Sequence, residues 1–357
     1  MLRSTDDLRI RSATEVIPPS ELLHELPVSE KAAETVSQAR ETIQKILRGE
    51  DNRLLVISGP CSVHDVEAAR EYAERLLSLK QPSAELFLVM RVYFEKPRTT
   101  VGWKGLINDP GLDGSFRIND GLRLARRLLL DLGNMGVPAG TEYLDPITPQ
   151  YVADLIAWGA IGARTTESQV HRELASGLSC PIGFKNATDG GLQIAVDAVV
   201  SASHPHHFLG VTKSGHSAIV ATHGNPDCHI ILRGGNGSPN YDADSVEKAA
   251  LRLQKAGLRP QVIIDCSHAN SGKDPDRQVL VCQEVAAQIA GGETRILGVM
   301  LESHLVPGRQ DLVSGKALTY GQSITDACMS WENTVDCLRN LTEAVRRRAS
   351  LRRDSPM

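Results

Sequence analysis

Short apolar runs alternate with amphipathic stretches along most of the chain. The apolar runs predict eight strands, at Leu54–Ser58, Leu86–Val92, Val137–Glu142, Gly159–Thr165, Pro181–Asn186, His229–Arg233, Val262–Ser267 and Ile296–Glu302. Helical periodicity falls between them, for example at Val66–Leu79, Leu122–Leu132, Pro149–Ala157, Ser168–Ser176, Ala243–Ala256 and Asp276–Ala290. Strands that alternate with helices in this way are typical of a parallel sheet.

One segment departs from this alternation. Phe208–Thr212 and Ser217–Thr222 are extended runs separated by four residues, which predicts an antiparallel hairpin inserted at about residues 207–223. The eight remaining strands are the number that closes a (β/α)8 barrel. An open doubly wound sheet is the competing architecture, but no GxGxxG motif follows the first strand. We therefore predict an α/β fold, a TIM barrel with an N-terminal extension and an inserted β-hairpin.

The ends of the chain differ from the barrel in pattern. Residues 1–50 are predicted to form an N-terminal extension, with a polar helix at Ser29–Leu47 that Gly49 ends. The catalytic barrel is expected at residues 51–347. The basic run at residues 346–353 indicates a solvated, frayed helix end, so residues 348–357 are predicted to be a flexible tail.

Composition narrows the class of protein. Hydrophobic residues make 41% and charged residues 23% of the chain, which excludes disordered and fibrous proteins. The net charge of -4 argues against nucleic acid or a membrane surface as a partner. Because no apolar run is long enough for a signal peptide or a membrane span, we expect a cytoplasmic protein. The seven cysteines form no CxxC pair, which favours free thiols over disulfides or a zinc ribbon.

Cationic side chains gather at the predicted carboxyl ends of the strands, which form the active face of a barrel. They are Arg91, Lys96, Arg98, Arg164, Lys185 and Arg233. Unpaired cations at one mouth repel each other, so the site is expected to hold small polyanions with more than one phosphate group. The ordinary alternative for any single one of these residues is an exposed surface charge.

A second group at the strand ends has the chemistry of metal ligands. It consists of Cys61, His268, Glu302, His304 and Asp326. Thiolate, imidazole and carboxylate together suit one divalent ion such as Mn, Fe, Co or Zn. The spacing of these residues follows no metal-binding motif. Cys61 as a small core residue and the histidines as ordinary polar residues therefore remain open at this point.

Seven runs of sequence carry a family resemblance. They are residues 59–62, 91–105, 162–168, 183–186, 232–235, 267–270 and 323–327, and the similarity extends from about residue 5 to 345. In this order the runs resemble signatures of the class I 3-deoxy-D-arabino-heptulosonate 7-phosphate (DAHP) synthases. The resemblance implies a metal-dependent transferase that condenses phosphoenolpyruvate with erythrose 4-phosphate and water. It releases phosphate in the first step of the shikimate pathway to aromatic amino acids.

The resemblance also implies residue roles. The metal ligands would be Cys61, His268, Glu302 and Asp326, without His304. Phosphoenolpyruvate would be held by Arg91, Lys96, Ala163, Arg164, Lys185 and Arg233, and the sugar phosphate by Arg98 and Thr99. We expect Lys96 to donate a proton, with a pKa lowered by its cationic neighbours, and Glu142 to orient or deprotonate water. Asp326 would also border the substrates.

Regulation and assembly follow from the same resemblance. Enzymes of this type are inhibited by phenylalanine, tyrosine or tryptophan, in a pocket between one subunit's extension and the neighbouring barrel. The matching residues here are Asp6, Asp7, Gln150, Ser179 and Val220. A homodimer or homotetramer is expected. Pro146 leads us to favour tyrosine as the effector, and the alternative is an arm that only covers a neighbour's surface.

Three other functions remain open from the sequence. The first is a Schiff-base aldolase with Lys185 as the nucleophile. The second is the related synthase that uses arabinose 5-phosphate, which lacks the run at residues 96–100. The third is a metal- or amino-acid-sensing barrel without turnover.

Overall fold

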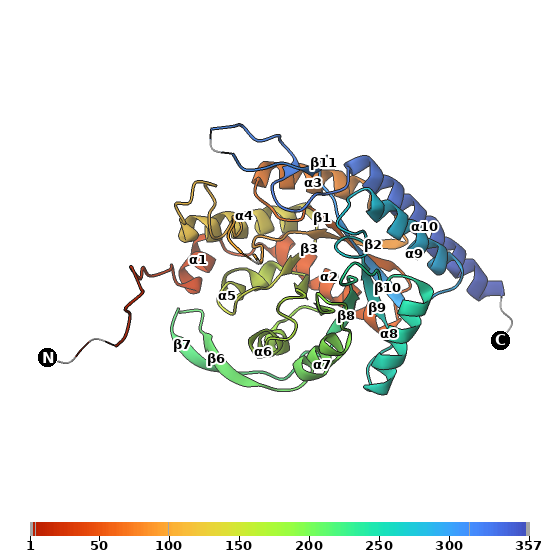
Figure 1. Cartoon of the computed structure of the whole chain (residues 1–357), viewed down its shortest axis with the longest axis horizontal. Helices are drawn as coiled ribbons and strands as arrows, with labels where there is room; N and C mark the ends of the chain where they lie inside the picture. Colours follow the sequence, from red (N-terminus) through yellow and green to blue (C-terminus); the bar gives the residue numbers. More distant parts are fainter. Residues whose placement is uncertain (1–2, 4, 99, 314, 355–357) are drawn as a thin grey trace.

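Eight parallel strands form a closed barrel in the computed structural model, which describes residue 3 and residues 5–98, 100–313 and 315–354 (Figure 1). The strands are β1 (Leu54–Gly59), β2 (Leu86–Arg91), β3 (Ala139–Glu142), β4 (Trp158–Ile161), β5 (Ile182–Lys185), β8 (His229–Leu232), β9 (Val262–Asp265) and β10 (Ile296–Glu302). They pair in the order β1-β10-β9-β8-β5-β4-β3-β2. The predicted (β/α)8 barrel is confirmed.

The strands are apolar because both of their faces are buried. Every residue of β1, β5, β8, β9 and β10 is buried, so polar and apolar positions do not alternate. Trp158, Val89 and Met300 belong to the cluster that fills the barrel. A second, larger cluster lies between the strands and the surrounding helices.

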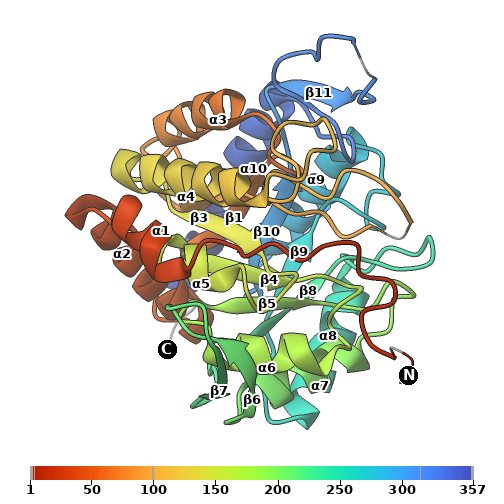
Figure 2. The same cartoon turned by 90° about the vertical axis from the view of Figure 1, so that its left-hand side faces the viewer.

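The helices surround this barrel (Figure 2). They are α3 (Val66–Ser78), α4 (Ile118–Met135), α5 (Pro149–Val152), α6 (Gln169–Gly177), α7 (Gln193–Ala202), α8 (Ala243–Lys255), α9 (Arg277–Ala290) and α10 (Trp331–Asp354). The helix predicted at 149–157 is split into α5 and a 3₁₀ turn, Ala153–Leu155. Buried Arg126 of α4 pairs with Asp154 in this turn at 2.8 Å and holds the segment against α4.

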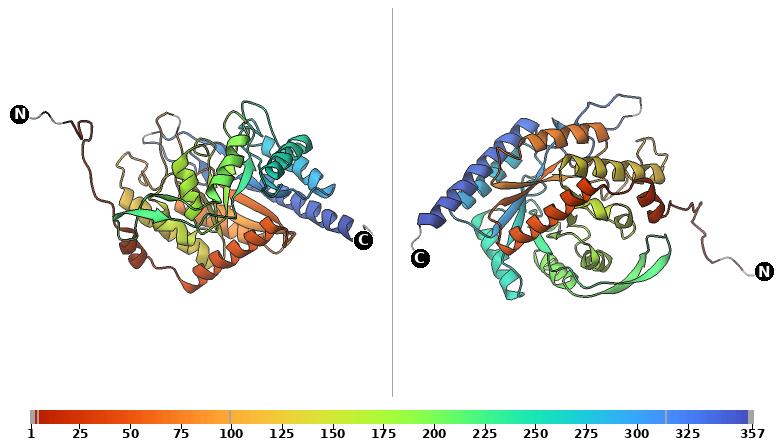
Figure 3. Two further views of the ribbon diagram at one scale, coloured as in Figure 1. Left: turned by 90° about the horizontal axis from the view of Figure 1, so that it is seen from below. Right: turned by 180° about the vertical axis from the view of Figure 1, so that it is seen from behind.

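The N-terminal extension contains α1 (Pro19–Glu25) and α2 (Glu30–Arg48). The Ser29 hydroxyl caps α2 by accepting from Ala32 N, and Gly49 ends the helix at φ +75°. Ile43 and Ile46 of α2 pack with the cluster inside the barrel, so α2 closes the amino end. The described residues from 5 to 16 form an arm that projects from the body (Figure 3).

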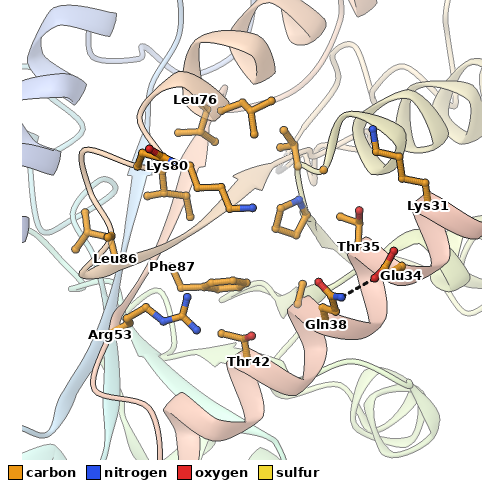
Figure 4. Close-up of a pocket in the computed structure, with 18 residues that line it drawn as sticks. Lys31, Glu34, Thr35, Gln38, Thr42, Arg53, Leu76, Lys80, Leu86 and Phe87 are labelled. Atoms are coloured by element: carbon orange, nitrogen blue, oxygen red, sulfur yellow. Dashed lines mark hydrogen bonds between the residues drawn. The ribbon is translucent and has the colours of Figure 1, made fainter.

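A cavity of about 810 Å³ lies between α2 and the beginnings of β1, β2 and β3 (Figure 4). Its walls include Lys80 and Phe87, and Gln38 donates to Glu34 on its α2 side. The cavity is at the amino end of the barrel. It is therefore remote from the carboxyl ends, where the predicted site residues lie.

The inserted hairpin is present as β6 (His207–Val211) and β7 (Ser217–Ala221), paired antiparallel. A short parallel pair, β11 (Val306–Arg309) and β12 (Gln322–Ser323), was not predicted. The tail predicted to be flexible from residue 348 is instead helical to Asp354. Arg348 is buried and donates to the carbonyls of Asn52 and Glu293. Among the described residues, no helix is long and apolar enough to cross a membrane.

Candidate active site

A cavity of about 260 Å³ opens at the carboxyl ends of the strands. Its lining includes the predicted residues Arg91, Lys96, Arg98, Glu142, Ala163, Arg164, Lys185, Arg233, His268 and Asp326. Thr99 lies outside the described residues. Thr188 and Lys273 also line the cavity and were not predicted. The structure thus brings together side chains from at least six strand ends around one small, strongly cationic space.

Arg91 lines this cavity and also contacts the segment after β1 that contains Cys61. Its guanidinium is buried, donates from Nε to the Pro60 carbonyl at 3.1 Å and lies 3.6 Å from the centre of the Tyr93 ring. Nη2 donates to Glu302 Oε1 at 2.8 Å. A Cβ on Gly59 would lie 2.5 Å from the Arg91 carbonyl oxygen, so this close approach of β1 and β2 requires glycine. Arg91 therefore orients Glu302 as well as facing the cavity.

Three potential metal donors converge beside the cavity. Single ligand atoms of Cys61, Glu302 and Asp326 all lie within 4.8 Å of one another. His268 Nε2 lies 3.8 Å from Glu302 Oε1, so the imidazole borders the same group. Thiolate, carboxylate and imidazole donors in a mostly buried position fit a divalent transition metal. His304 is outside this group, because its Nδ1 accepts from Leu305 N and its ring packs near His64 and Tyr72.

Lys96 lies among these donors. Its Nζ is 2.8 Å from Cys61 Sγ and 3.0 Å from Asp326 Oδ2. Burial alone would lower the pKa of Lys96, but the negative charges of Cys61, Glu302 and Asp326 outweigh it and raise the pKa above its ordinary value. The expectation of a lowered pKa was therefore wrong. Burial raises the pKa of the Cys61 thiol itself, and the charge of Glu302 adds to that effect.

Sequence reasoning assigned no role to Asp265, although this residue ends β9. Asp265 is fully buried, and its Oδ2 lies 2.8 Å from Lys185 Nζ and 2.8 Å from His268 Nδ1. The His268 N–H is not aimed closely enough at Oδ2 to count as a hydrogen bond, so this contact is mainly electrostatic. Burial would raise the pKa of Asp265, but His268 and Lys185 hold it well below its usual range. Asp265 therefore links a cavity-lining cation with a proposed metal ligand.

Two further acids belong to this region, and one of them lines the cavity. Glu142 lines the cavity at the end of β3, and a Cβ on Gly162 would lie 2.0 Å from its Oε1, so glycine there leaves room for the carboxylate. Glu95 was not predicted as a site residue. Its pKa is raised to about 8, first by burial and then by the charges of Asp145 and Glu142. A carboxyl group with this pKa is mostly protonated at pH 7.

The predicted effector residues lie in two regions. Gln150 is beside the hairpin, since Lys213 Nζ donates to its carbonyl oxygen. Ser179 follows α6 and Val220 is in β7, and these elements meet where the Ser176 and Thr222 hydroxyls bond at 2.7 Å. Asp6 and Asp7 are on the exposed arm. The described residues therefore place the first three on one side of the barrel and the acids on its extension.

The closed (β/α)8 barrel with a cationic cavity at its carboxyl end defines a TIM-barrel protein with a candidate anion-binding site. Comparison with known proteins identifies the family. The profile of the DAHP synthetase I family matches residues 25–339. The Phe-sensitive phospho-2-dehydro-3-deoxyheptonate aldolase of Escherichia coli K12 is 63% identical over 344 residues, covering 96% of this chain and 98% of that protein. The phospho-2-dehydro-3-deoxyheptonate aldolase of Haemophilus influenzae is 60% identical over 350 residues, covering 97% of each.

A solved structure agrees with these sequence matches. The phospho-2-dehydro-3-deoxyheptonate aldolase of Francisella tularensis SCHU S4 superposes with a TM-score of 0.93 at 54% identity, covering 95% of this chain and 99% of that one. The chain belongs to the DAHP synthetase I family. The predicted resemblance and the prediction of an enzyme that forms carbon–carbon bonds are both confirmed.

Proposed function

We propose that this protein condenses phosphoenolpyruvate with erythrose 4-phosphate and water to give DAHP and inorganic phosphate. The observation that carries the proposal is the convergence of five predicted phosphoenolpyruvate-binding cations on one cavity beside the Cys61, Glu302 and Asp326 donors. In a member of this family, the cations match a substrate with a carboxylate and a phosphate. The neighbouring metal donors match a second substrate whose aldehyde a metal can polarise.

Phosphoenolpyruvate would bind through charge. Its carboxylate and phosphate carry more negative charge than one cation can balance, and the predicted binders Arg91, Lys96, Arg164, Lys185 and Arg233 border the cavity. Ala163 would contribute its backbone to the same binding surface. Arg98 is more exposed and farther out on the loop, which suits the phosphate of the longer sugar, with Thr99 predicted beside it.

One divalent metal ion would be held by Cys61, His268, Glu302 and Asp326, and when bound it would supply Lewis-acid polarisation of the aldehyde oxygen. The methylene carbon C3 of phosphoenolpyruvate attacks the aldehyde carbon and forms the new C–C bond, which leaves C2 electron-poor. Lys96 holds a proton at Nζ and gives it to the developing alkoxide, which is more basic than an amine. A water adds to C2 of phosphoenolpyruvate, the carbon that carries the phosphate ester, and phosphate leaves with cleavage of the bond between C2 and the bridging oxygen.

The water requires orientation and the loss of a proton. Glu142 lines the same cavity as the cations and is the proposed residue for this step. Deprotonation of the water by a carboxylate, followed by departure of phosphate, balances the proton that Lys96 donates. Cys61 and His268 act as ligands in this scheme and take no proton from substrate.

The alternatives fit less well. A Schiff-base lysine must lose its proton to attack a carbonyl, yet Lys185 is paired with the buried charge of Asp265 at 2.8 Å. Membership of the DAHP synthetase I family disfavours the arabinose 5-phosphate enzyme and a sensing barrel without turnover.

For regulation, we propose phenylalanine as the effector in place of tyrosine, because the 63% identical relative is named Phe-sensitive. The effector would bind at Gln150, Ser179 and Val220 of one subunit, with Asp6 and Asp7 of another subunit. A homodimer or homotetramer is proposed accordingly. Leu209 and Ile219 of the hairpin, 82% and 78% exposed, offer apolar surface for such a contact.

The test is consumption of phosphoenolpyruvate by the purified protein with Mn²⁺ and either erythrose 4-phosphate or arabinose 5-phosphate. We expect rapid consumption with the first sugar only, abolished by EDTA and reduced by phenylalanine more than by tyrosine or tryptophan. Equal rates with both sugars, or EDTA-resistant activity trapped by borohydride, would contradict the assignment.

A further inference from the structure

One buried carboxylate contacts both the proposed metal site and the proposed phosphoenolpyruvate site. We propose that Asp265 is a positioning residue that holds the proposed metal ligand His268, and that it competes with bound phosphoenolpyruvate for Lys185. Metal and phosphoenolpyruvate would then bind with positive coupling. This inference rests on the proposed function and adds to it a residue and a linkage that the ligand assignments do not contain.

The two carboxylate oxygens of Asp265 have different partners. Oδ2 lies 2.8 Å from both Lys185 Nζ and His268 Nδ1. Oδ1 accepts from the backbone N of Ser267 at 3.0 Å. This bond shapes the turn after β9, in which His268 takes the left-handed backbone conformation at φ +54°, which is uncommon outside glycine. The carboxylate therefore determines both where His268 sits and which charge faces its ring.

On the metal side, the Asp265 carboxylate lies 2.8 Å from His268 Nδ1, and its negative charge favours a proton on that nitrogen. A neutral imidazole with its proton at Nδ1 presents the Nε2 lone pair, and Nε2 is the atom on the Glu302 side, at 3.8 Å. The same turn aims Ser267, whose hydroxyl donates to Glu302 Oε2 at 2.9 Å. Asp265 thus orients two proposed ligands, one directly and one through its neighbour.

On the anion side, the Lys185 side chain is 5% exposed, and Asp265 is its charged partner among the described residues. Lys185 also lines the cavity, so an entering phosphate or carboxylate competes with Asp265 for this ammonium. When Lys185 turns to the anion, Asp265 keeps its charge and acts on His268 alone. This uncompensated negative charge beside a proposed metal ligand favours a bound cation, and linkage requires that the metal tighten anion binding by the same factor.

The test measures Mn²⁺ affinity by electron paramagnetic resonance, with and without phosphoenolpyruvate and with no sugar present. Phosphoenolpyruvate should tighten Mn²⁺ binding by the parent protein at least about fivefold. For Asp265→Asn, Mn²⁺ affinity should fall about 10- to 100-fold, as for other residues that orient metal ligands. The effect of phosphoenolpyruvate on Mn²⁺ should vanish. The metal-free variant should still bind phosphoenolpyruvate at least as tightly as the parent, because the competitor for Lys185 has lost its charge.

The matched control is Asp227→Asn. Asp227 is also a buried carboxylate, bonded to Gln44 Nε2 at 2.8 Å beyond the amino end of β8, so its variant should keep both affinities and their coupling. Mn²⁺ affinity within twofold of the parent in Asp265→Asn, retained coupling, or parallel loss of phosphoenolpyruvate binding would overturn the inference. If the parent protein itself fails to bind Mn²⁺ or to consume both substrates, the proposed function fails instead.

A second variant covers the case in which Asp265→Asn does not fold. Lys185→Gln removes the cation from the same pair and leaves Asp265 to His268. The inference predicts Mn²⁺ affinity at least equal to that of the parent, with no further tightening by phosphoenolpyruvate. Weaker Mn²⁺ binding by Lys185→Gln would contradict it.

Discussion

Replacement of His229 by glutamine should remove a large part of the acid sensitivity of the fold. His229 begins β8 and is buried at the amino end of the barrel. Trp158 Nε1 donates to its Nε2 at 3.1 Å, so the Nδ1 proton is directed to the Asp227 carbonyl, also at 3.1 Å. Both ring nitrogens are satisfied only in the neutral form. A second proton, on Nε2, would point at the Trp158 N–H and break that hydrogen bond.

The size of this effect follows from the pKa. Burial lowers the pKa of His229 from 6.5 to about 4. Because the folded-state pKa is lowered, the stability that neutral His229 supports is present above pH 6.5 and is lost as the pH falls from 6.5 towards 4. Each pH unit in which only the unfolded chain is protonated costs about 1.4 kcal/mol, so about 2 kcal/mol is lost between pH 8 and pH 5.

The assay is urea unfolding of the chelator-treated protein at pH 8 and pH 5. The glutamine in His229→Gln keeps an acceptor for Trp158 but has no titrating group. The difference in unfolding free energy between the two pH values should therefore be about 2 kcal/mol smaller in this variant than in the parent. If both proteins lose the same stability on acidification, His229 is not held neutral by its surroundings and the reasoning fails.

Three further changes test other parts of the account. Lys96→Met should reduce turnover at least about 100-fold, as expected for loss of a proton donor. The control Lys45→Met, at an exposed position of α2, should leave turnover unchanged. Near-normal turnover of Lys96→Met would show that Lys96 is not the proton donor. Gly105→Ala should lower the melting temperature and activity, since its Cβ would lie 2.1 Å from the Phe94 carbonyl oxygen at φ +128°; an unchanged melting curve would refute this close contact. Deletion of residues 1–15 should abolish inhibition by phenylalanine and leave catalysis, and persistent inhibition would show that the arm is not part of the effector site.

The barrel could be predicted from sequence because its strands bury both faces. Leu54–Ser58 was expected and Leu54–Gly59 was found, since a run of apolar residues between polar helices has few other structures available. Helix α7 was harder to recognise, because Ala195, Val196, Ala198 and Val199 are all buried and leave little polar contrast along it. The basic tail was misjudged for a related reason. Composition indicates solvent for Arg348, but nearby backbone carbonyls accept its hydrogen bonds.

The candidate residues could be placed at one end of the barrel from the sequence, but their interactions could not be predicted. Strand-end position and family resemblance identify Cys61, Lys96 and Lys185 without reference to any distance. The pKa of Lys96 depends on acids contributed by three distant parts of the chain, so considering only its cationic neighbours gave the wrong sign. Asp265 was visible at the end of β9, but its double contact with Lys185 and His268 exists only in the folded barrel.

The most direct test of the proposed reaction uses phosphoenolpyruvate with ¹⁸O in the oxygen that bridges carbon and phosphorus. Mass spectrometry of the released phosphate, together with the amount of DAHP formed, reports which bond breaks. The account predicts labelled phosphate, formed one for one with DAHP, and only when erythrose 4-phosphate and a divalent metal are present. Unlabelled phosphate, or phosphate released without the sugar, would contradict it.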